Sequence, residues 1–544
     1  MSNDFKKVLV KDDRLMVSDS VSYAVHKGGQ NVVCAPIPAL ALSNSSLTFN
    51  IQVPSEQTVV DRRLVWAQTI SVSFVASIST LAYGTDVCLA PFPSHQLCST
   101  IQATVNNNTT SINIRDVLPA LLKMEEGVEL QRFSGTCPTL PDQMYSAENA
   151  VGDVNNANGA INIFAGATMP RGAFWSYPVN KGIPTGVSMP APTGSGSTWT
   201  YTVTWSTAEP FICPPFLWGT QLSNTSGIYG VQNMTLLCNF SNGNRAIRFL
   251  TTAAKTAYLG SGSLPVTVNT PTVAKMLLNY LTPHPSDLMP ARNVVPYMEY
   301  PRYFSSTSST INAGQVGTIS SNTYNLNQIP DKLIIFVRYP QSSQTPSIND
   351  VFMSIQGISI NFNNNAGILS SASTADLYRY SVEAGNNQHW NEWSGQAFDG
   401  SGLGQATTNN PTVGSVLALD FGRHIQLIED YYAPGSLGNF QIQFNLDVYN
   451  QSTANLATPE LVLITVNSGV LVTERGQSSV YTGILTKQDV LDASQQEPYS
   501  LTQVARKVGA GLLDRGKALP KHFGGKHLKG MVEGLQGGLS KRLM

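Results

Sequence analysis

The sequence predicts an all-β protein in which two β-sandwiches follow one another along the chain. Hydrophobic and polar residues alternate from near residue 47 to near residue 475, which is typical of strands with one buried face. Only 12% of the residues are charged, and Asn, Ser and Thr supply the polarity, as they do on strand faces and in turns. A chain of 544 residues is too long for one core, and a proline-rich stretch at 282–301 separates its two strand-rich parts.

The expected strands are of two kinds. Half-buried strands, with strict alternation, are predicted at 47–53, 70–74, 199–205, 234–240, 358–362 and 440–448. Two runs, LIIFV at 333–337 and LVLITV at 461–466, are apolar on both faces. We therefore expect these two strands to be central and covered on both sides.

Helices are expected to be few and short. The candidates are residues 112–124, 272–281, 373–382 and 486–493, the last two with Ser or Thr N-cap signals. Long loops are expected at 190–198 and 398–412, where Gly, Asn, Ser, Thr and Pro dominate.

The chain shows no constellation typical of an enzyme, and no cofactor or metal site is expected. It has no GxSxG, HExxH or GxxxxGK[ST] motif, and its seven histidines are scattered. His424 lies near Asp420, Glu429 and Asp430, where a metal or proton-transfer role is open but a hydrogen-bonded structural role on a strand is favoured. The sequence thus favours a structural or binding protein.

Cysteine usage indicates a reducing compartment. The six cysteines include no CxxC pair and no metal-ligand spacing, so buried thiols are expected. The first residues contain no apolar stretch typical of a secretory signal, and no apolar run is long enough to span a bilayer.

A glycan-binding or viral attachment protein is the alternative function class. Such a β-sandwich would present exposed aromatic side chains, and Trp390 and Trp393 are candidates. Core or interface packing is the favoured interpretation of this pair.

The end of the chain is basic, in contrast to the rest. From residue 501 onward there are nine basic residues against two acidic ones, a net charge of +7, so the whole-chain charge of -1 leaves -8 on the first 500 residues. Residues 500–519 have the pattern of a basic amphipathic helix, although three glycines each cost it about 1 kcal/mol relative to alanine. The basic residues, expected to contact DNA, a membrane or the inner face of an assembly, are Arg506, Lys507, Arg515, Lys517, Lys521, Lys526, Lys529, Lys541 and Arg542. A disordered tail that only keeps the protein soluble is the alternative.

Several long strings resemble the major capsid proteins of polinton-like viruses and adintoviruses, which are relatives of the virophages. These strings lie in the expected order at 44–66, 326–338, 358–395, 414–427 and 482–491. Together they cover the chain from about residue 40 to 495, which makes the resemblance far more specific than a short motif.

The resemblance implies a double jelly roll, that is, two tandem eight-stranded sandwiches with a few short helices and a basic C-terminal tail. The corresponding domains are an N-terminal arm at 1–45, a first jelly roll at 46–285, a second at 286–480 and a helix with the Gly-rich tail at 481–544. It further implies a homotrimer with pseudo-hexameric outline that tiles an icosahedral shell around double-stranded DNA.

The expected partners and location follow from the same resemblance. The partners are neighbouring capsomers, penton and minor capsid proteins, and possible DNA or internal membrane at the tail. The protein is expected in the virion, after synthesis and assembly in the host cytoplasm or nucleus. The segment Leu-Gln-Gly-Gly at 535–538 is similar to sites cut by adenovirus-type proteases, which would cleave between Gly538 and Leu539.

Overall fold

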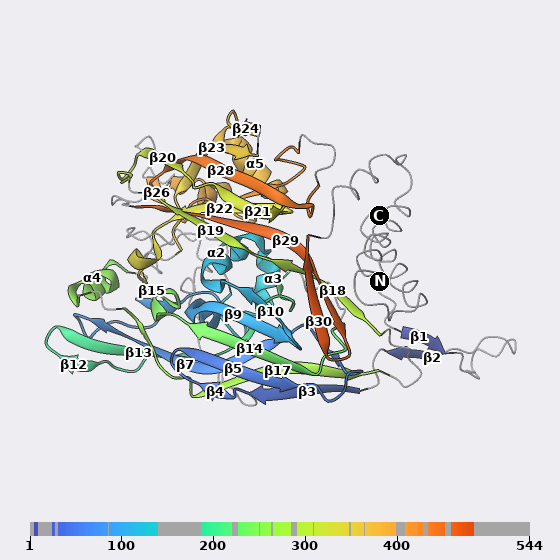
Figure 1. The fold of residues 1–544 in the computed structure, drawn as a ribbon. Helices are drawn as coiled ribbons and strands as arrows, with labels where there is room; N and C mark the ends of the chain where they lie inside the picture. Colours follow the sequence, from blue (N-terminus) through green and yellow to red (C-terminus); the bar gives the residue numbers. More distant parts are fainter. Residues whose placement is uncertain are drawn as a thin grey trace, which may run out of the picture.

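The computed structural model describes fifteen segments of the chain. They are residues 5–8, 24–27, 31–84, 86–139, 186–219, 227–249, 251–262, 265–283, 291–307, 309–346, 350–363, 365–398, 409–427, 433–451 and 458–483. The predicted helix at 486–493 and the basic tail lie outside these residues. Figure 1 shows the described part as two stacked β-sandwiches with helices between and around them.

The first sandwich consists of two antiparallel sheets, which occupy the lower part of Figure 1. One sheet has the order β11-β13-β7-β17-β3 and the other β10-β9-β14-β5-β4. The first contains β3 (Asn31–Pro38), β7 (Val65–Ala76), β11 (Gly186–Ser188), β13 (Thr198–Pro210) and β17 (Val273–Thr282), with β6 (Val59–Val60), β12 (Thr193–Ser195) and β16 (Thr267–Val268) paired to them. The second contains β4 (Ala41–Leu42), β5 (Ser46–Gln52), β9 (Cys98–Val105), β10 (Asn108–Ile112) and β14 (Asn233–Phe240).

The second sandwich follows the same plan. Its sheets have the orders β18-β29-β22-β27 and β20-β28-β23-β24. The first contains β18 (Asn293–Glu299), β22 (Lys332–Arg338), β27 (Leu417–Asp420) and β29 (Glu460–Glu474), with β19 (Arg302–Ser306) and β30 (Gln477–Thr482) paired to β29. The second contains β20 (Val316–Ser320), β23 (Ser354–Phe362), β24 (Asn365–Ile368) and β28 (Leu437–Tyr449), with β21 (Tyr324–Gln328) paired to β28.

Short strand pairs and helices complete the described part. The pairs are β1 (Phe5–Val8) with β2 (Ala24–Lys27), β8 (Val87–Leu89) with β15 (Ile247–Phe249), and β25 (Gln396–Phe398) with β26 (Asn409–Pro411). The helices are α1 (Pro93–Leu97), α2 (Ile114–Met124), α3 (Gly127–Gln131), α4 (Thr252–Gly260), α5 (Thr374–Glu383), α6 (Trp390–Trp393) and the 3₁₀ turns η5 (Gly243–Arg245) and η6 (Gln341–Ser343).

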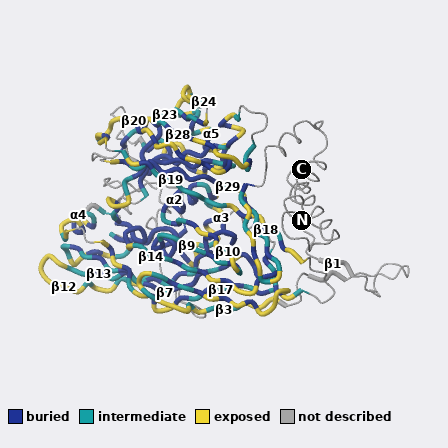
Figure 2. The backbone as a smooth tube through the Cα atoms, in the orientation of Figure 1, coloured by how far each residue is buried: buried dark blue, intermediate teal, exposed yellow. Residues whose placement is uncertain are grey.

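Alternating strands build the cores as the sequence predicts. On β7 the side chains of Ile70, Val72 and Phe74 are buried while the residues between them are partly exposed. β7 pairs with β13 over twelve residues, so the buried sets of both strands lie on one face of the sheet. Figure 2 shows that the buried residues are concentrated inside each sandwich and in the layer between the two sandwiches.

Two of the predicted helices are confirmed. Residues 114–124 form α2 and residues 374–383 form α5. Ser373 caps α5, because its hydroxyl accepts from the Asp376 N–H while the Asp376 carboxylate accepts from the Ser373 N–H.

The predicted helix at 272–281 is wrong, because this segment forms strand β17. Leu277 and Leu281 complete an apolar pattern that also fits helical spacing. In the structure β17 pairs with β3 on one side and β7 on the other, and only alternate residues are buried. Pairing on both edges therefore overrides the local preference.

The predicted loops are partly ordered into strands. Residues 193–195 form β12, which makes a tight hairpin with β13 in which Gly196 has a positive φ of 62°. The ends of the second loop form β25 and β26, and residues 399–408 between them lie outside the described residues.

Candidate functional site: the interface between the two sandwiches

The two sandwiches share a packed layer formed by β22 and β29. On β22, Leu333, Ile335 and Val337 point into the core of the second sandwich. Ile334 and Phe336 point the other way, into a cluster that also holds residues of the first sandwich. This confirms the prediction that residues 333–337 and 461–466 form strands covered on both sides.

Helix α2 supplies the opposing surface from the first sandwich. Val117, Leu118 and Leu121 are buried in the same cluster as Phe336 and Ile464. Asn387 of the second sandwich caps the last turn of α2, because its backbone N–H donates to the Lys123 carbonyl at 2.8 Å and its side-chain amide to the Met124 carbonyl at 2.9 Å. The last two carbonyls of this helix, those of Lys123 and Met124, are thus satisfied from across the interface.

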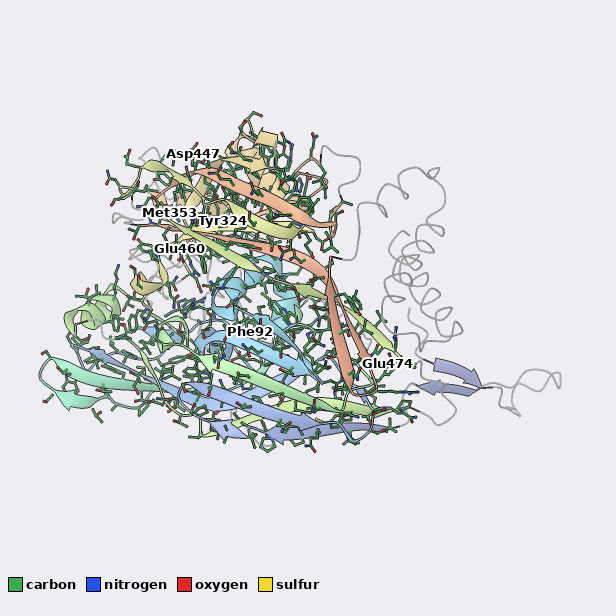
Figure 3. All side chains as sticks on the ribbon, viewed as in Figure 1. Phe92, Tyr324, Met353, Asp447, Glu460 and Glu474 are labelled. Carbon is green, nitrogen blue, oxygen red and sulfur yellow. The ribbon has the colours of Figure 1, made fainter. Side chains whose placement is uncertain are left out.

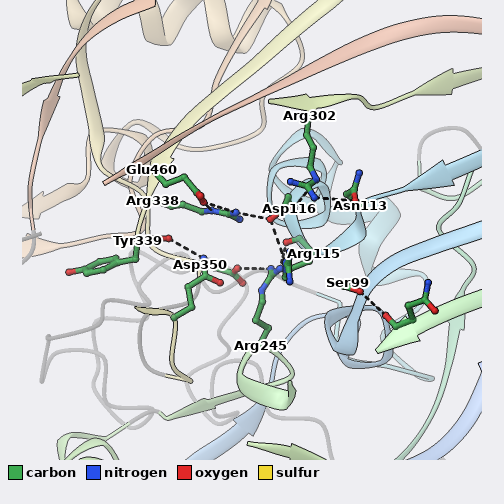
Figure 4. A network of polar contacts seen from close by, with 12 residues as sticks. Ser99, Asn113, Arg115, Asp116, Arg245, Arg302, Arg338, Tyr339, Asp350 and Glu460 are labelled. Carbon is green, nitrogen blue, oxygen red and sulfur yellow. Dashed lines mark hydrogen bonds and ion pairs between the residues drawn. The ribbon is translucent and has the colours of Figure 1, made fainter. Parts of the chain in front are cut away.

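The other end of α2 carries a buried carboxylate surrounded by arginines (Figure 4). Asp116, fully buried, forms ion pairs with Arg338 of β22 at 2.6 Å and with Arg302 of β19 at 3.0 Å. Burial acts to raise the pKa of Asp116, but Arg338, Arg302 and Arg115 outweigh it and hold the pKa below its ordinary value. Arg338 also pairs with Glu460 of β29 at 3.0 Å, so its charge is shared between two carboxylates.

A second carboxylate extends this network to η5 and β15 of the first sandwich. Asp350 forms ion pairs with Arg245 at 3.1 Å and with Arg248. Burial acts to raise the pKa of Asp350, but the two arginines lower it below its ordinary value. Desolvation lowers the pKa of Arg245 to about 10, so this residue remains charged at neutral pH.

A buried ion pair joins the two sandwiches near the C-terminal end of α2. Lys123 pairs with Glu392 of α6, and both side chains are at most 6% exposed. Gln388 donates to the same carboxylate at 3.2 Å. Each end of α2 is therefore connected to the second sandwich by charge, and its middle by apolar contact.

Strand β29 extends the connection beyond the layer. Its first half pairs with β22 and its second half with β18 and β30, which lie against the first sandwich. Figure 3 shows Glu460 and Glu474, its two ends, at the levels of the second and the first sandwich respectively. There the Asn108 amide donates to the Ser478 carbonyl, and the Thr473 hydroxyl to the Tyr229 carbonyl. One fifteen-residue strand thus ties both sandwiches into one unit.

The structure places some of the sequence-predicted residues and not others. The basic tail residues, Gly538 and Leu539 lie outside the described residues. His424 has a structural role, because its Nδ1 accepts from the Asp420 N–H at 3.0 Å in the turn after β27, rather than on a strand as expected. Trp393 is fully buried in the core of the second sandwich, whereas Trp390 is 42% exposed. Core packing therefore explains the position of Trp393.

The cysteines and the described acidic and histidine residues give no sign of a reactive centre. All six cysteines lie in described segments as thiols, five of them buried and Cys34 exposed. Within the described residues no group of three or more His, Cys, Asp or Glu is placed to hold a metal ion. Among those same residues, no helix is both long and apolar enough to cross a membrane.

Sequence reasoning missed the charged interface. Asp116, Arg338 and Glu460 are far apart in the chain, and no local pattern joins them. One signal was present, since Arg338 and Glu460 directly flank the two strands that are apolar on both faces in a chain with few charges.

Comparisons with known proteins agree with this architecture. The Sputnik virophage major capsid protein first-domain family matches residues 3–281, and the major capsid protein V20 C-terminal domain family matches residues 300–469. The putative capsid protein V20 of Sputnik virophage is 28% identical over 523 residues, which covers 92% of this chain and 84% of that protein.

Solved structures show the same fold. A chain in the cryo-EM structure of the Sputnik virophage superposes with a TM-score of 0.74 at 26% identity, covering 92% of this chain and 97% of that one. The crystal structure of the mavirus major capsid protein gives a TM-score of 0.67 at 13% identity, covering 91% of this chain and 99% of that one. The fold and its interface thus define a double jelly-roll capsid protein, as the sequence resemblance implies. More particularly, the chain belongs to the Sputnik virophage major capsid protein family, and its role is to form a capsid.

Proposed function

We propose that this protein forms homotrimeric capsomers with a pseudo-hexameric outline, which tile an icosahedral shell around double-stranded DNA. The observation that carries the proposal is the fixed relation of the two sandwiches through Asp116, Arg338 and β29. Three copies of a rigid two-sandwich unit give six similar corners, which is the shape needed to tile a surface. A loose link between the sandwiches would not define that outline.

Sedimentation velocity and cryo-electron microscopy of the purified protein test this assembly. The expected result is a trimer or larger assembly with a six-cornered outline. A stable monomer at high protein concentration contradicts the proposal. The protein is further proposed to have no catalytic activity, since assembly requires none and the described residues offer no reactive constellation.

The proposed domains are those expected from the sequence: an arm at 1–45, whose strands β3 and β4 pair with the sheets of the first sandwich, jelly rolls at 46–285 and 286–480, and a tail at 481–544. Each jelly roll contributes to the capsomer. The partners proposed beyond the trimer are neighbouring capsomers and penton and minor capsid proteins. Synthesis and assembly are proposed to occur in the host cytoplasm or nucleus, ending in the virion.

The basic tail is proposed to face inward, where its nine basic residues contact DNA or an internal membrane. Deleting residues 501–544 tests this. Trimers are expected to form unchanged while particles fail to assemble or lose their contents, and normal particles contradict the role. A matched variant in which Arg506, Lys507, Arg515 and Lys517 are replaced by Gln keeps the length of the tail and removes four positive charges. It therefore distinguishes the effect of charge from the effect of length on assembly.

Cleavage between Gly538 and Leu539 is a separate proposal about maturation. The intact mass of the protein in particles is expected to correspond to a chain ending at Gly538. A chain ending at Met544 in mature particles contradicts it.

A further inference from the structure

One side of the first sandwich is lined by an apolar segment that is exposed to solvent. Residues 32–42 read VVCAPIPALAL, and no charged residue occurs between Lys27 and Glu56. The exposed fraction is 58% for Val32, 72% for Leu40 and 42% for Leu42. Exposed apolar residues are normal when scattered, but a continuous run of them indicates a contact surface.

This segment forms the edge of both sheets of the sandwich. β3 is the last strand of one sheet and β4 the last strand of the other, and only residues 39–40 separate them. The backbone N–H of Ala39 donates to the Ala274 carbonyl near the start of β17. The neighbouring residue on β17, Val273, is 51% exposed. The β3–β4 edge is defined here as Val32, Val33, Leu40, Leu42 and Val273.

Hydrogen bonding shows that the half of β3 next to β4 is poorly suited to pair with another strand. The Ala39 N–H points to β17, so residues 35 and 37 face β17 and residues 36 and 38 face outward. By the same alternation Val32 and Cys34 also face outward, so proline, which has no N–H to donate, occupies two of the four outward positions of β3. A partner at this half of the edge is therefore expected to pack through side chains rather than to extend the sheet, which favours a folded surface over an extended segment.

We propose that the β3–β4 edge packs against a second copy of this chain in the assembled capsid. The inference rests on the proposed function, because a capsid subunit meets copies of itself on several sides. The absence of charge from residues 28–55 removes both like-charge repulsion and the cost of desolvating ions when two copies meet here. The same contact, repeated by symmetry, closes a lattice from modest individual affinities.

Cys34 provides a natural probe of this contact. It lies on β3 between Val33 and Ala35, and it is exposed whereas the other five cysteines are buried. Iodoacetamide is small enough to reach any exposed thiol. In the full chain, its reaction with Cys34 is expected to slow at least about tenfold on going from dissociated subunits to assembled capsomers or shells.

Variants test the surface itself. Val32→Lys with Leu40→Lys is expected to weaken assembly at least about tenfold, which corresponds to ~1.4 kcal/mol. The same change at Val128 and Val316, which are 66% and 57% exposed, controls for added charge and is expected to leave Cys34 protected in the assembled fraction. Thermal denaturation verifies that each variant is folded.

The outcomes separate this inference from the proposed function. If Cys34 reacts equally fast in assembled and dissociated protein, the β3–β4 edge is not a contact between copies, and the inference is overturned. The proposal that the protein forms capsomers is unaffected by this result. Failure of the unchanged chain to assemble overturns the proposed function instead. If Cys34 is protected in the isolated chain and becomes reactive only after residues 484–544 are deleted, the chain's own end covers the edge and the inference is overturned.

Discussion

Arg338 and Asp116 meet at 2.6 Å across the boundary between the two sandwiches, although 222 positions separate them in the chain. Their side chains are 3% and 1% exposed, so neither charge can be hydrated if the other is lost. A buried ion pair is weak evidence of net stability, but breaking one by removing a single partner is strongly destabilising. This pair therefore makes the relative placement of the sandwiches sensitive to single substitutions.

The first prediction concerns Asp116→Ala. This change leaves Arg338 and Arg302 without their shared carboxylate, and we expect it to lower the free energy of unfolding by about 3–5 kcal/mol. Urea denaturation followed by tryptophan fluorescence measures the loss. Arg132→Ala is the matched control, because the Arg132–Glu129 pair is 59% and 19% exposed and is expected to be worth less than about 1 kcal/mol. If both variants lose the same free energy of unfolding, the buried ion pair contributes no more to stability than an exposed one, and the prediction is wrong.

The second prediction is a loss of stability in acid. The pKa values of Asp116 and Asp350 are lower in the folded protein than the ordinary value of 3.8. A lowered pKa contributes stability that is fully present above the ordinary value and is lost as pH falls through the folded value. The free energy of unfolding is therefore expected to fall below about pH 4.

Urea titrations from neutral pH to about pH 2 measure this dependence. In the double variant Asp116→Asn with Asp350→Asn, stability is lower at neutral pH and its slope below pH 4 is smaller than in the unchanged protein. An unchanged slope in the double variant would assign acid sensitivity to other carboxylates.

An element was predictable from the sequence when the interactions that determine its structure lie within a short stretch of the chain. The strands at 333–337 and 461–466 were predictable as doubly covered because both of their faces are apolar. Helix α5 was predictable because Ser373 and Asp376 form its cap within four residues. Strand β17 was not predictable, because its apolar pattern fits both a helix and a strand. The choice between them depends on its pairing with β3 and β7, which is not local in the sequence. The Asp116–Arg338 contact was also out of reach, since its geometry exists only after both sandwiches fold.

The third prediction compares two neighbouring tryptophans. Trp393 is fully buried in the second core and its indole N–H donates to the Val416 carbonyl at 3.1 Å, whereas Trp390 is 42% exposed. Trp393→Ala is expected to cost about 3–5 kcal/mol through lost packing, since the Val416 carbonyl still accepts from Ser381 and Asn386. Trp390→Ala is expected to cost less than about 1 kcal/mol, since a side chain that is already partly hydrated leaves no buried cavity. Denaturation midpoints at a fixed protein concentration measure both, and a larger loss for Trp390 would contradict the packing role.

The fourth prediction concerns a buried carboxylate in the first sandwich. Glu209 accepts from the Ser94 N–H at 2.8 Å and the Thr207 hydroxyl at 3.0 Å through Oε1, and from His95 Nδ1 at 2.6 Å through Oε2. His95 Nε2 accepts from the Ile212 N–H at 3.1 Å, so the ring is held in one neutral tautomer with its proton on Nδ1.

Replacing Glu209 by Gln tests this arrangement with almost no change in volume. The amide accepts through one atom only, so whichever way it turns, an N–H of Gln faces a donor of the first sandwich. The His95 ring cannot relieve the clash by moving its proton to Nε2, because that atom would then face the Ile212 N–H. Glu209→Gln is therefore expected to lower the free energy of unfolding by about 1–3 kcal/mol. Thr207→Val, which removes one donor and leaves the carboxylate its other partners, is expected to cost about 1 kcal/mol in the same urea titration. A Glu209→Gln protein as stable as the unchanged one would show that His95 can turn or change its tautomer within the core.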